Sequence, residues 1–182
     1  MPEKKRSLTA GGSVLLVDDE ESIRGSLGDL LSACGFTVMT ADSYKEAVKA
    51  IAGSKEIEAI VCDMKMPGKS GLEVLHYLNE QDRDIPLIFL TGYGTLESCQ
   101  EAVREGAFDY ILKPVTEKDD LVLPLKHAVE RFRLEKRNKE MQLDILRMAE
   151  EHQLLVSQLL SDTETRGAVQ QKIQAIVDKW KT

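Results

Sequence analysis

The stretch VLLVDDE, residues Val14–Glu20, decides the fold of this chain. Four apolar residues, two of them β-branched, run directly into three acids. A short apolar run bounded by polar residues is typical of a strand buried on both faces, as in parallel sheets. Ligands of open α/β sheets gather at the carboxyl ends of the strands. Because neighbouring carboxylates repel one another, the acids at this strand end indicate a cation site.

Four more apolar runs follow, and amphipathic segments separate them. The expected strands are residues 14–17, 36–39, 59–62, 86–90 and 109–112. We expect Ser22 and Ser43 to cap the first two helices, and we place two more helices around residues 72–78 and 96–105. Five such alternations predict βαβ units with right-handed crossovers. The predicted fold is α/β, a flavodoxin-like, doubly wound, five-stranded parallel sheet of order 2-1-3-4-5, followed by a long helical extension.

Polar residues follow four of the five expected strands: Asp18 and Asp19, Asp63, Thr91, and Lys113. In the 2-1-3-4-5 order these four strands are neighbours, so their terminal side chains converge at one edge. A hard cation, Mg²⁺, fits between Asp19, Asp63 and a loop carbonyl, with several waters retained. The hydroxyl of Thr91 and the ammonium of Lys113 are expected to face an anionic group. This combination suits phosphoryl transfer to a carboxylate nucleophile.

Residues 13–124 resemble the receiver domain of two-component response regulators. Four motifs carry the resemblance, in family order and at family spacing: Leu16–Glu20 (LVDDE), Cys62–Gly68 (CDMKMPG), Leu90–Gly94 (LTGYG) and Asp109–Pro114 (DYILKP). The residues of the third and fourth motifs are similar to those in receivers of the nitrogen-regulator type.

The resemblance implies a role for each site residue. Asp63 matches the phosphoacceptor. Asp19 matches a direct metal ligand, and Asp18 matches an acid that acts on the metal largely through water. Lys65 would lend its backbone carbonyl to the same ion. Thr91 matches the switch hydroxyl that moves to the phosphoryl group.

The remaining matches lie on the last motifs. Tyr110 corresponds to the aromatic switch residue, whose ring turns inward after phosphorylation. Lys113 corresponds to the lysine that pairs with a phosphoryl oxygen, and the Lys113–Pro114 bond is expected to be cis. Gly92 leaves room for the phosphoryl group. Lys65 and Tyr93 occupy variable positions that tune the lifetime of the acyl phosphate in this family.

Each of these residues alone has an ordinary structural interpretation. An isolated acid can cap a helix, an isolated Thr can close a turn, and an isolated Lys is usually solvated. Their coincidence at four strand ends favours a site. A phosphatase-like hydrolase would need a second acid two residues after Asp63, where Lys65 stands. The segment Gly92–Gly94 lacks the P-loop pattern, so we expect no nucleotide site there.

Composition limits the other classes of function. Residues 1–115 hold 19 acids and 12 bases, a net charge of −7, whereas residues 116–182 hold 12 of each. This balance argues against direct nucleic-acid binding, and a transcription factor would also need a helix-turn-helix, which the tail lacks. No apolar run reaches the ~20 residues that cross a bilayer, and no signal peptide is visible. Three scattered cysteines suggest buried thiols in a reducing cytoplasm, not a disulfide or zinc site.

The ends of the chain differ from the middle. Residues 1–12 show no periodicity and are expected to be a disordered lead-in. Pro124 is expected to kink the last receiver helix or delay its start. Residues 125–161 continue as a long helix with a heptad series typical of a coiled coil: Leu134, Asn138, Met141, Ile145, Met148, His152, Leu155 and Leu159. Asn138 and His152 could fix its register; as a phosphoacceptor, His152 lacks histidine-kinase-like surroundings.

Residues 162–182 read as a break followed by a short amphipathic helix with one apolar stripe: Val169, Ile173, Ile176, Val177 and Trp180. That helix could fold back on the coil, dock on a partner, or begin a further domain. The leading functional hypothesis is a non-enzymatic phosphoacceptor that a histidine kinase or phosphotransfer protein charges. Its output would be a change in a homodimer formed through the C-terminal helix and the face of the fourth helix, fifth strand and fifth helix, exposure of the last helix, or a signal to a downstream output domain. The alternative is a coiled-coil scaffold whose receiver is only a docking platform.

Overall fold

The computed structural model describes most of the chain: residues 11–92, 100, 103–161, 167, 171, 172 and 174. The chain forms two compact units, Met1–Glu135 and Lys136–Thr182. Of the expected disordered lead-in at residues 1–12, residues 1–10 lie outside the described residues, but the expectation is wrong for Gly12, which is buried and begins the first strand. Most of the expected fourth helix, and the break and stripe of the tail, also lie outside the described residues.

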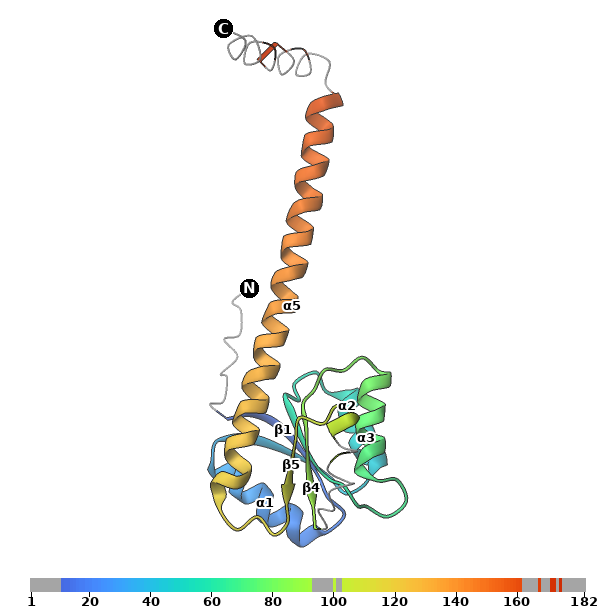
Figure 1. Cartoon of the computed structure of the whole chain (residues 1–182), viewed down its shortest axis with the longest axis vertical. Helices are drawn as coiled ribbons and strands as arrows, with labels where there is room; N and C mark the ends of the chain where they lie inside the picture. The colour runs from blue at the N-terminus through green and yellow to red at the C-terminus, as the bar shows by residue number, and fades with distance from the viewer. Residues whose placement is uncertain are drawn as a thin grey trace. The chain divides into compact units, whose positions relative to one another are not determined.

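A five-stranded parallel sheet forms the centre of the first unit (Figure 1). Its strands are β1 (Gly12–Val17), β2 (Phe36–Ala41), β3 (Ala59–Asp63), β4 (Leu87–Thr91) and β5 (Asp109–Leu112). They lie in the order β2-β1-β3-β4-β5, with every pair parallel, which confirms the predicted fold. The middle strands β1, β3 and β4 are buried on both faces because their side chains are continuously apolar.

Helices cover both faces of this sheet, as Figure 1 shows. On one face, α2 (Tyr44–Gly53) and α3 (Gly71–Glu80) pack through a cluster that includes Ile51 and Leu78. On the other face, α1 (Glu21–Ala33) packs beside the first turns of α5 through a cluster that includes Leu31 and Leu125. The sheet is therefore doubly wound.

The helix starts depend on local capping chemistry. Ser43 is the N-cap of α2, and its hydroxyl accepts a hydrogen bond from the N–H of Glu46, as predicted. The prediction that Ser22 caps α1 is wrong, because the helix begins at Glu21 with Glu20 as its N-cap. The carboxylate of Asp18 accepts the N–H of Glu20 at 2.9 Å. This turn after β1 starts the helix before Ser22 is reached.

Helix α5 is a single helix of 44 residues, Lys118–Ser161. It begins before Pro124, so the expectation that the proline delays its start is wrong. The proline lies in the second turn, where it cannot donate a hydrogen bond to the carbonyl of Asp120. Five apolar side chains near the start of α5 lie in the core of the first unit: Leu121, Val122, Leu125, Ala128 and Val129.

Two further observations concern the thiols and the membrane. Cys62 is buried and Cys34 half-buried, both as free thiols, whereas Cys99 lies outside the described residues. Across the part of the chain that the structure describes, no helix combines the length and the apolar composition needed to cross a membrane.

Candidate functional site

Three carboxylates meet at the carboxyl edge of the sheet. Asp18 and Asp19 directly follow β1, and Asp63 is the last residue of β3. The strands pair in parallel with Val17 opposite Cys62, so the acids emerge side by side. One oxygen from each of the three carboxylates lies within 4.8 Å of the others. Asp18 and Asp63 are buried, and Asp19 is exposed.

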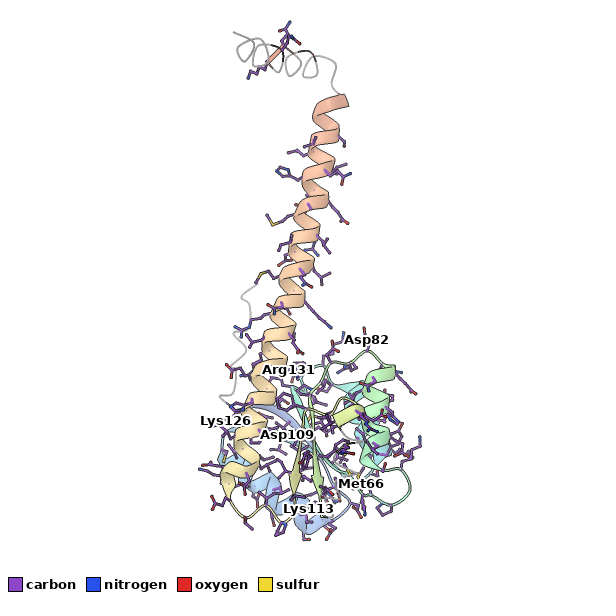
Figure 2. All side chains as sticks on the ribbon, in the orientation of Figure 1. Met66, Asp82, Asp109, Lys113, Lys126 and Arg131 are labelled. Atoms are coloured by element: carbon purple, nitrogen blue, oxygen red, sulfur yellow. The ribbon has the colours of Figure 1, made fainter. Side chains whose placement is uncertain are left out.

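The ammonium of Lys113 bridges the two buried acids. Its Nζ donates to Oδ2 of Asp18 at 2.7 Å and to Oδ2 of Asp63 at 2.9 Å. Burial of the amine is the largest single influence on the pKa of Lys113, and it lowers that pKa. The hydrogen bonds to Asp18 and Asp63 and the charges of these carboxylates together outweigh burial, so the pKa of Lys113 is raised. Figure 2 labels Lys113 at this end of the sheet. The Lys113–Pro114 peptide bond is cis, as predicted.

Backbone groups restrain the acids further. Oδ1 of Asp63 accepts the N–H of Lys65 at 3.1 Å, which ties the phosphoacceptor candidate to the loop that follows it. The guanidinium of Arg24 donates to the carbonyl of Asp18 at 2.6 Å. Sequence reasoning missed Arg24, because helical periodicity draws attention to the apolar face of α1. Its position one turn after the acid pair was the available signal.

The two switch candidates lie differently. Thr91, the last residue of β4, is only 1% exposed, and its carbonyl accepts the N–H of Lys113 at 2.8 Å. The structure thus brings Thr91 to the same edge as the acids. Tyr110 lies in β5 with its side chain 40% exposed, so in this state its ring is not enclosed in the core.

The loop after Asp63 is braced at its far end. Ser70 and Glu73 form a capping box at the start of α3, and the hydrogen bond from Ser70 lowers the pKa of Glu73. The ammonium of Lys69 lies 4.2 Å from the ring centroid of Tyr44, in cation–π contact with α2. The loop that carries the Lys65 carbonyl is therefore held on both sides.

The donor set fits a hard divalent cation. Three carboxylates face one ammonium, and oxygen is the ligand that Mg²⁺ prefers. Cys62, next to Asp63, is a poor ligand here, because burial and then the neighbouring carboxylates raise the pKa of its thiol and keep it protonated. The edge can thus hold a cation on the acids and present an ammonium to an anion.

Comparisons with known proteins agree with this geometry. The family model described as the response regulator receiver domain matches residues 14–125. The C4-dicarboxylate transport transcriptional regulatory protein DctD of Rhizobium meliloti (strain 1021) is 33% identical over 173 residues, covering 94% of this chain and 36% of that protein. The DNA-binding transcriptional regulator NtrC of Escherichia coli (strain K12) is 32% identical over 133 residues, covering 73% of this chain and 28% of that protein.

Solved structures give the same fold. A response regulator receiver domain protein from Clostridium thermocellum superposes with a TM-score of 0.64 at 35% identity, covering 68% of this chain and 98% of its own. NtrX from Brucella abortus, solved in complex with ATP, gives a TM-score of 0.66 at 29% identity, covering 72% of this chain and 30% of its own. The chain spans only 28–36% of the length of the curated relatives named above.

Proposed function

We propose that this chain, which belongs to the family of response regulator receiver domains, accepts a phosphoryl group on Asp63 from a histidine kinase or a phosphotransfer protein. One observation carries the proposal. The Asp63 carboxylate lies at the carboxyl edge of the sheet, with the Lys113 ammonium at 2.9 Å and an oxygen of each of the other two acids within 4.8 Å. A nucleophile, a candidate cation site and a hydrogen-bond donor for an anion thus lie together.

The transfer needs little from the protein beyond positioning. A carboxylate oxygen of Asp63 attacks the phosphorus; the O–P bond forms as the N–P bond to the donor imidazole breaks, and that nitrogen keeps the electron pair. Lys113 gives up part of its bond to Asp63 and donates to a phosphoryl oxygen. The hydroxyl of Thr91 then moves to another phosphoryl oxygen, and the ring of Tyr110 turns inward.

The acid cluster is assigned to Mg²⁺. Asp19, Asp63 and the main-chain carbonyl of Lys65 would hold the ion, with Asp18 acting largely through water. When bound, the ion neutralises charge that develops on the phosphoryl oxygens. Hydrolysis of the acyl phosphate at the same site resets the module, so we assign no separate enzymatic substrate to this chain.

The output we assign is self-association in the cytoplasm. The coil positions Met141, Ile145, Met148 and Leu155 are 55–68% exposed along α5. Apolar side chains at heptad spacing are typical of a helix that pairs with a second helix. Phosphorylation would bias this homodimer through the face of the fourth helix, β5 and α5, which also carries exposed Leu112. The scaffold alternative is not favoured, because it leaves the acid cluster and its lysine without a role.

The phosphoacceptor is tested by substitution. Asp63→Asn should abolish Mg²⁺-dependent labelling by acetyl phosphate, measured on phosphate-affinity gels. Asp29→Asn, at an exposed acid of α1, is the matched control and should label as the wild type does. Labelling that survives Asp63→Asn would place the acceptor elsewhere.

The dimer is tested separately by light scattering with and without beryllofluoride. Ile145→Lys, in the heptad series, should dissociate the dimer because it places a charge in the seam. Leu146→Lys is a close control, since Ile145 is 59% and Leu146 61% exposed and only Ile145 belongs to the series. Equal effects of the two substitutions would exclude a heptad interface.

A further inference from the structure

Arg24 links the start of α1 to the acid pair. Its Nη1 donates to the carbonyl oxygen of Asp18 at 2.6 Å, a short hydrogen bond with a charged donor. That carbonyl belongs to the peptide unit that joins Asp18 to Asp19. Because a peptide unit is planar, fixing its oxygen also fixes the direction in which the next residue continues.

The other polar groups of Asp18 have partners as well. Its N–H donates to the carbonyl of Ala41 at 3.2 Å. Oδ1 accepts the N–H of Glu20, and Oδ2 accepts the ammonium of Lys113. Asp18 itself is completely buried, and its partners Arg24, Glu20 and Lys113 reach it from less buried positions. Asp18 thus serves as a fixed frame, on which the exposed Asp19 is carried.

We propose that Arg24 is a positioning residue of the cation site. By holding the Asp18–Asp19 peptide plane, it aims the Asp19 carboxylate at Asp63 before any cation arrives. The inference rests on the proposed function, since it assigns Arg24 to the same Mg²⁺ site. The guanidinium contacts a main-chain oxygen of the frame, so it acts on the ligands through the backbone.

Two effects of Arg24 on cation affinity have opposite signs, and this makes the role measurable. A positive charge near the acids repels Mg²⁺, so its loss by itself would tighten binding. The hydrogen bond preorganises the ligands, so its loss by itself would weaken binding. Positioning therefore predicts weaker binding in a variant without the guanidinium, and a purely electrostatic role predicts tighter binding.

The experiment titrates the full chain with Mg²⁺ alone and follows amide resonances by NMR, with urea unfolding measured on every variant. Arg24→Gln should weaken Mg²⁺ binding roughly tenfold, the lower end of the range for residues that orient metal ligands. Arg24→Lys, which keeps the charge but not the planar fork, should fall between this variant and the wild type. It also serves if Arg24→Gln fails to fold.

Arg83 provides a matched control. It donates to the carbonyl of Ser54 at 2.9 Å, the same kind of bond at a similar, intermediate burial. Ser54 lies in the loop before β3 and Arg83 in the loop before β4, so this bond forms at the amino edge of the sheet, away from the acids. Arg83→Gln should therefore lower stability to a similar degree and change Mg²⁺ affinity less than twofold.

The outcomes separate the inference from the function beneath it. Unchanged or tighter Mg²⁺ binding in Arg24→Gln overturns the positioning role, and so does equal weakening in Arg83→Gln. If the wild-type chain itself shows no saturable Mg²⁺ binding, the proposed function fails together with the inference. If the wild type shows saturable Mg²⁺ binding and Arg24→Gln binds Mg²⁺ with the same affinity, the function stands and Arg24 is merely structural.

Discussion

Gly71, the first residue of α3, lies close to the end of β3, the strand that carries Asp63. A Cβ at this position would collide with the main-chain oxygen of Asp63, and would lie 3.0 Å from Cε1 of Phe89 and 3.1 Å from Sγ of Cys62. The N–H of Gly71 also donates to the carbonyl of Met64 at 3.1 Å. Gly71→Ala therefore tests whether this close approach sets the position of Asp63.

The expected cost follows from these contacts. Ordinary carbon contacts lie at about 3.5–4.0 Å, so all three neighbours are too close, and the nearest is backbone of a buried strand that cannot rotate away. Overpacking of this kind costs about 1–3 kcal/mol. Alanine's helix propensity offsets at most ~1 kcal/mol of it, and less at a first helical residue. We expect a net loss of about 2 kcal/mol. Phosphorylation should be about tenfold slower, because moving the main chain of Asp63 also misplaces its carboxylate.

Native-state hydrogen exchange of the β3 amides measures the stability loss, and acetyl-phosphate labelling measures the function. A loss of about 2 kcal/mol should speed exchange roughly thirtyfold. The matched control is Gly28→Ala in α1, where an added Cβ would meet nothing within 4 Å. There the helix propensity of alanine should stabilise the chain by about 0.5–1 kcal/mol. If Gly71→Ala exchanged and labelled like the wild type, the contact could not be what fixes Asp63.

Three further predictions concern charged groups. Replacing Lys113 with Met removes two charge-assisted hydrogen bonds to buried carboxylates. Urea unfolding without Mg²⁺ should show that the free energy of unfolding falls by about 3 kcal/mol, and by less with Mg²⁺ present. Equal losses in both buffers would argue against a cation at these acids. A double-mutant cycle of Glu58→Gln and Arg133→Gln should give a coupling energy of about 1 kcal/mol, discounted because the two side chains are 17% and 27% exposed, and a coupling near zero would contradict the two 2.8 Å bonds that join them. The hydrogen bond from Ser70 lowers the pKa of Glu73, so the stability that Glu73 contributes is present above its ordinary value of 4.5 and is lost as the pH falls through the folded-state pKa. The difference in unfolding free energy between Glu73→Gln and the wild type should accordingly shrink between neutral pH and pH ~3; a gap that widened toward acid would have the wrong sign.

Much of the site could be predicted from the sequence because parallel sheets convert strand order into proximity. Asp18, Asp63, Thr91 and Lys113 each stand at the end of an apolar run, and right-handed crossovers leave few ways to order those runs. Once the order is 2-1-3-4-5, the polar ends must meet at one edge. The fold and the meeting of these four residues were therefore accessible without coordinates.

The details of capping and packing were less accessible. Ser22 has the residue type of an N-cap. The carboxylate of Asp18, however, accepts the N–H of Glu20 and forms a turn there, so α1 begins at Glu21. Pro124 suggested a kink or a late start for α5, yet the helix begins six residues before it because packing of its apolar side chains outweighs the lost hydrogen bond. Local propensity is a weak guide where tertiary contacts compete with it.

The sequence by itself determined the five strands, their order and which acids share an edge, because periodicity and strand ends are local patterns. Only the tertiary structure decided what holds those acids in place. The bond from Arg24 to the carbonyl of Asp18 and the contact of Gly71 with Asp63 join groups on different elements. The sequence places Arg24 one turn after the acid pair, but whether its guanidinium reaches the carbonyl of Asp18 is decided only when the elements pack within a few ångströms of one another.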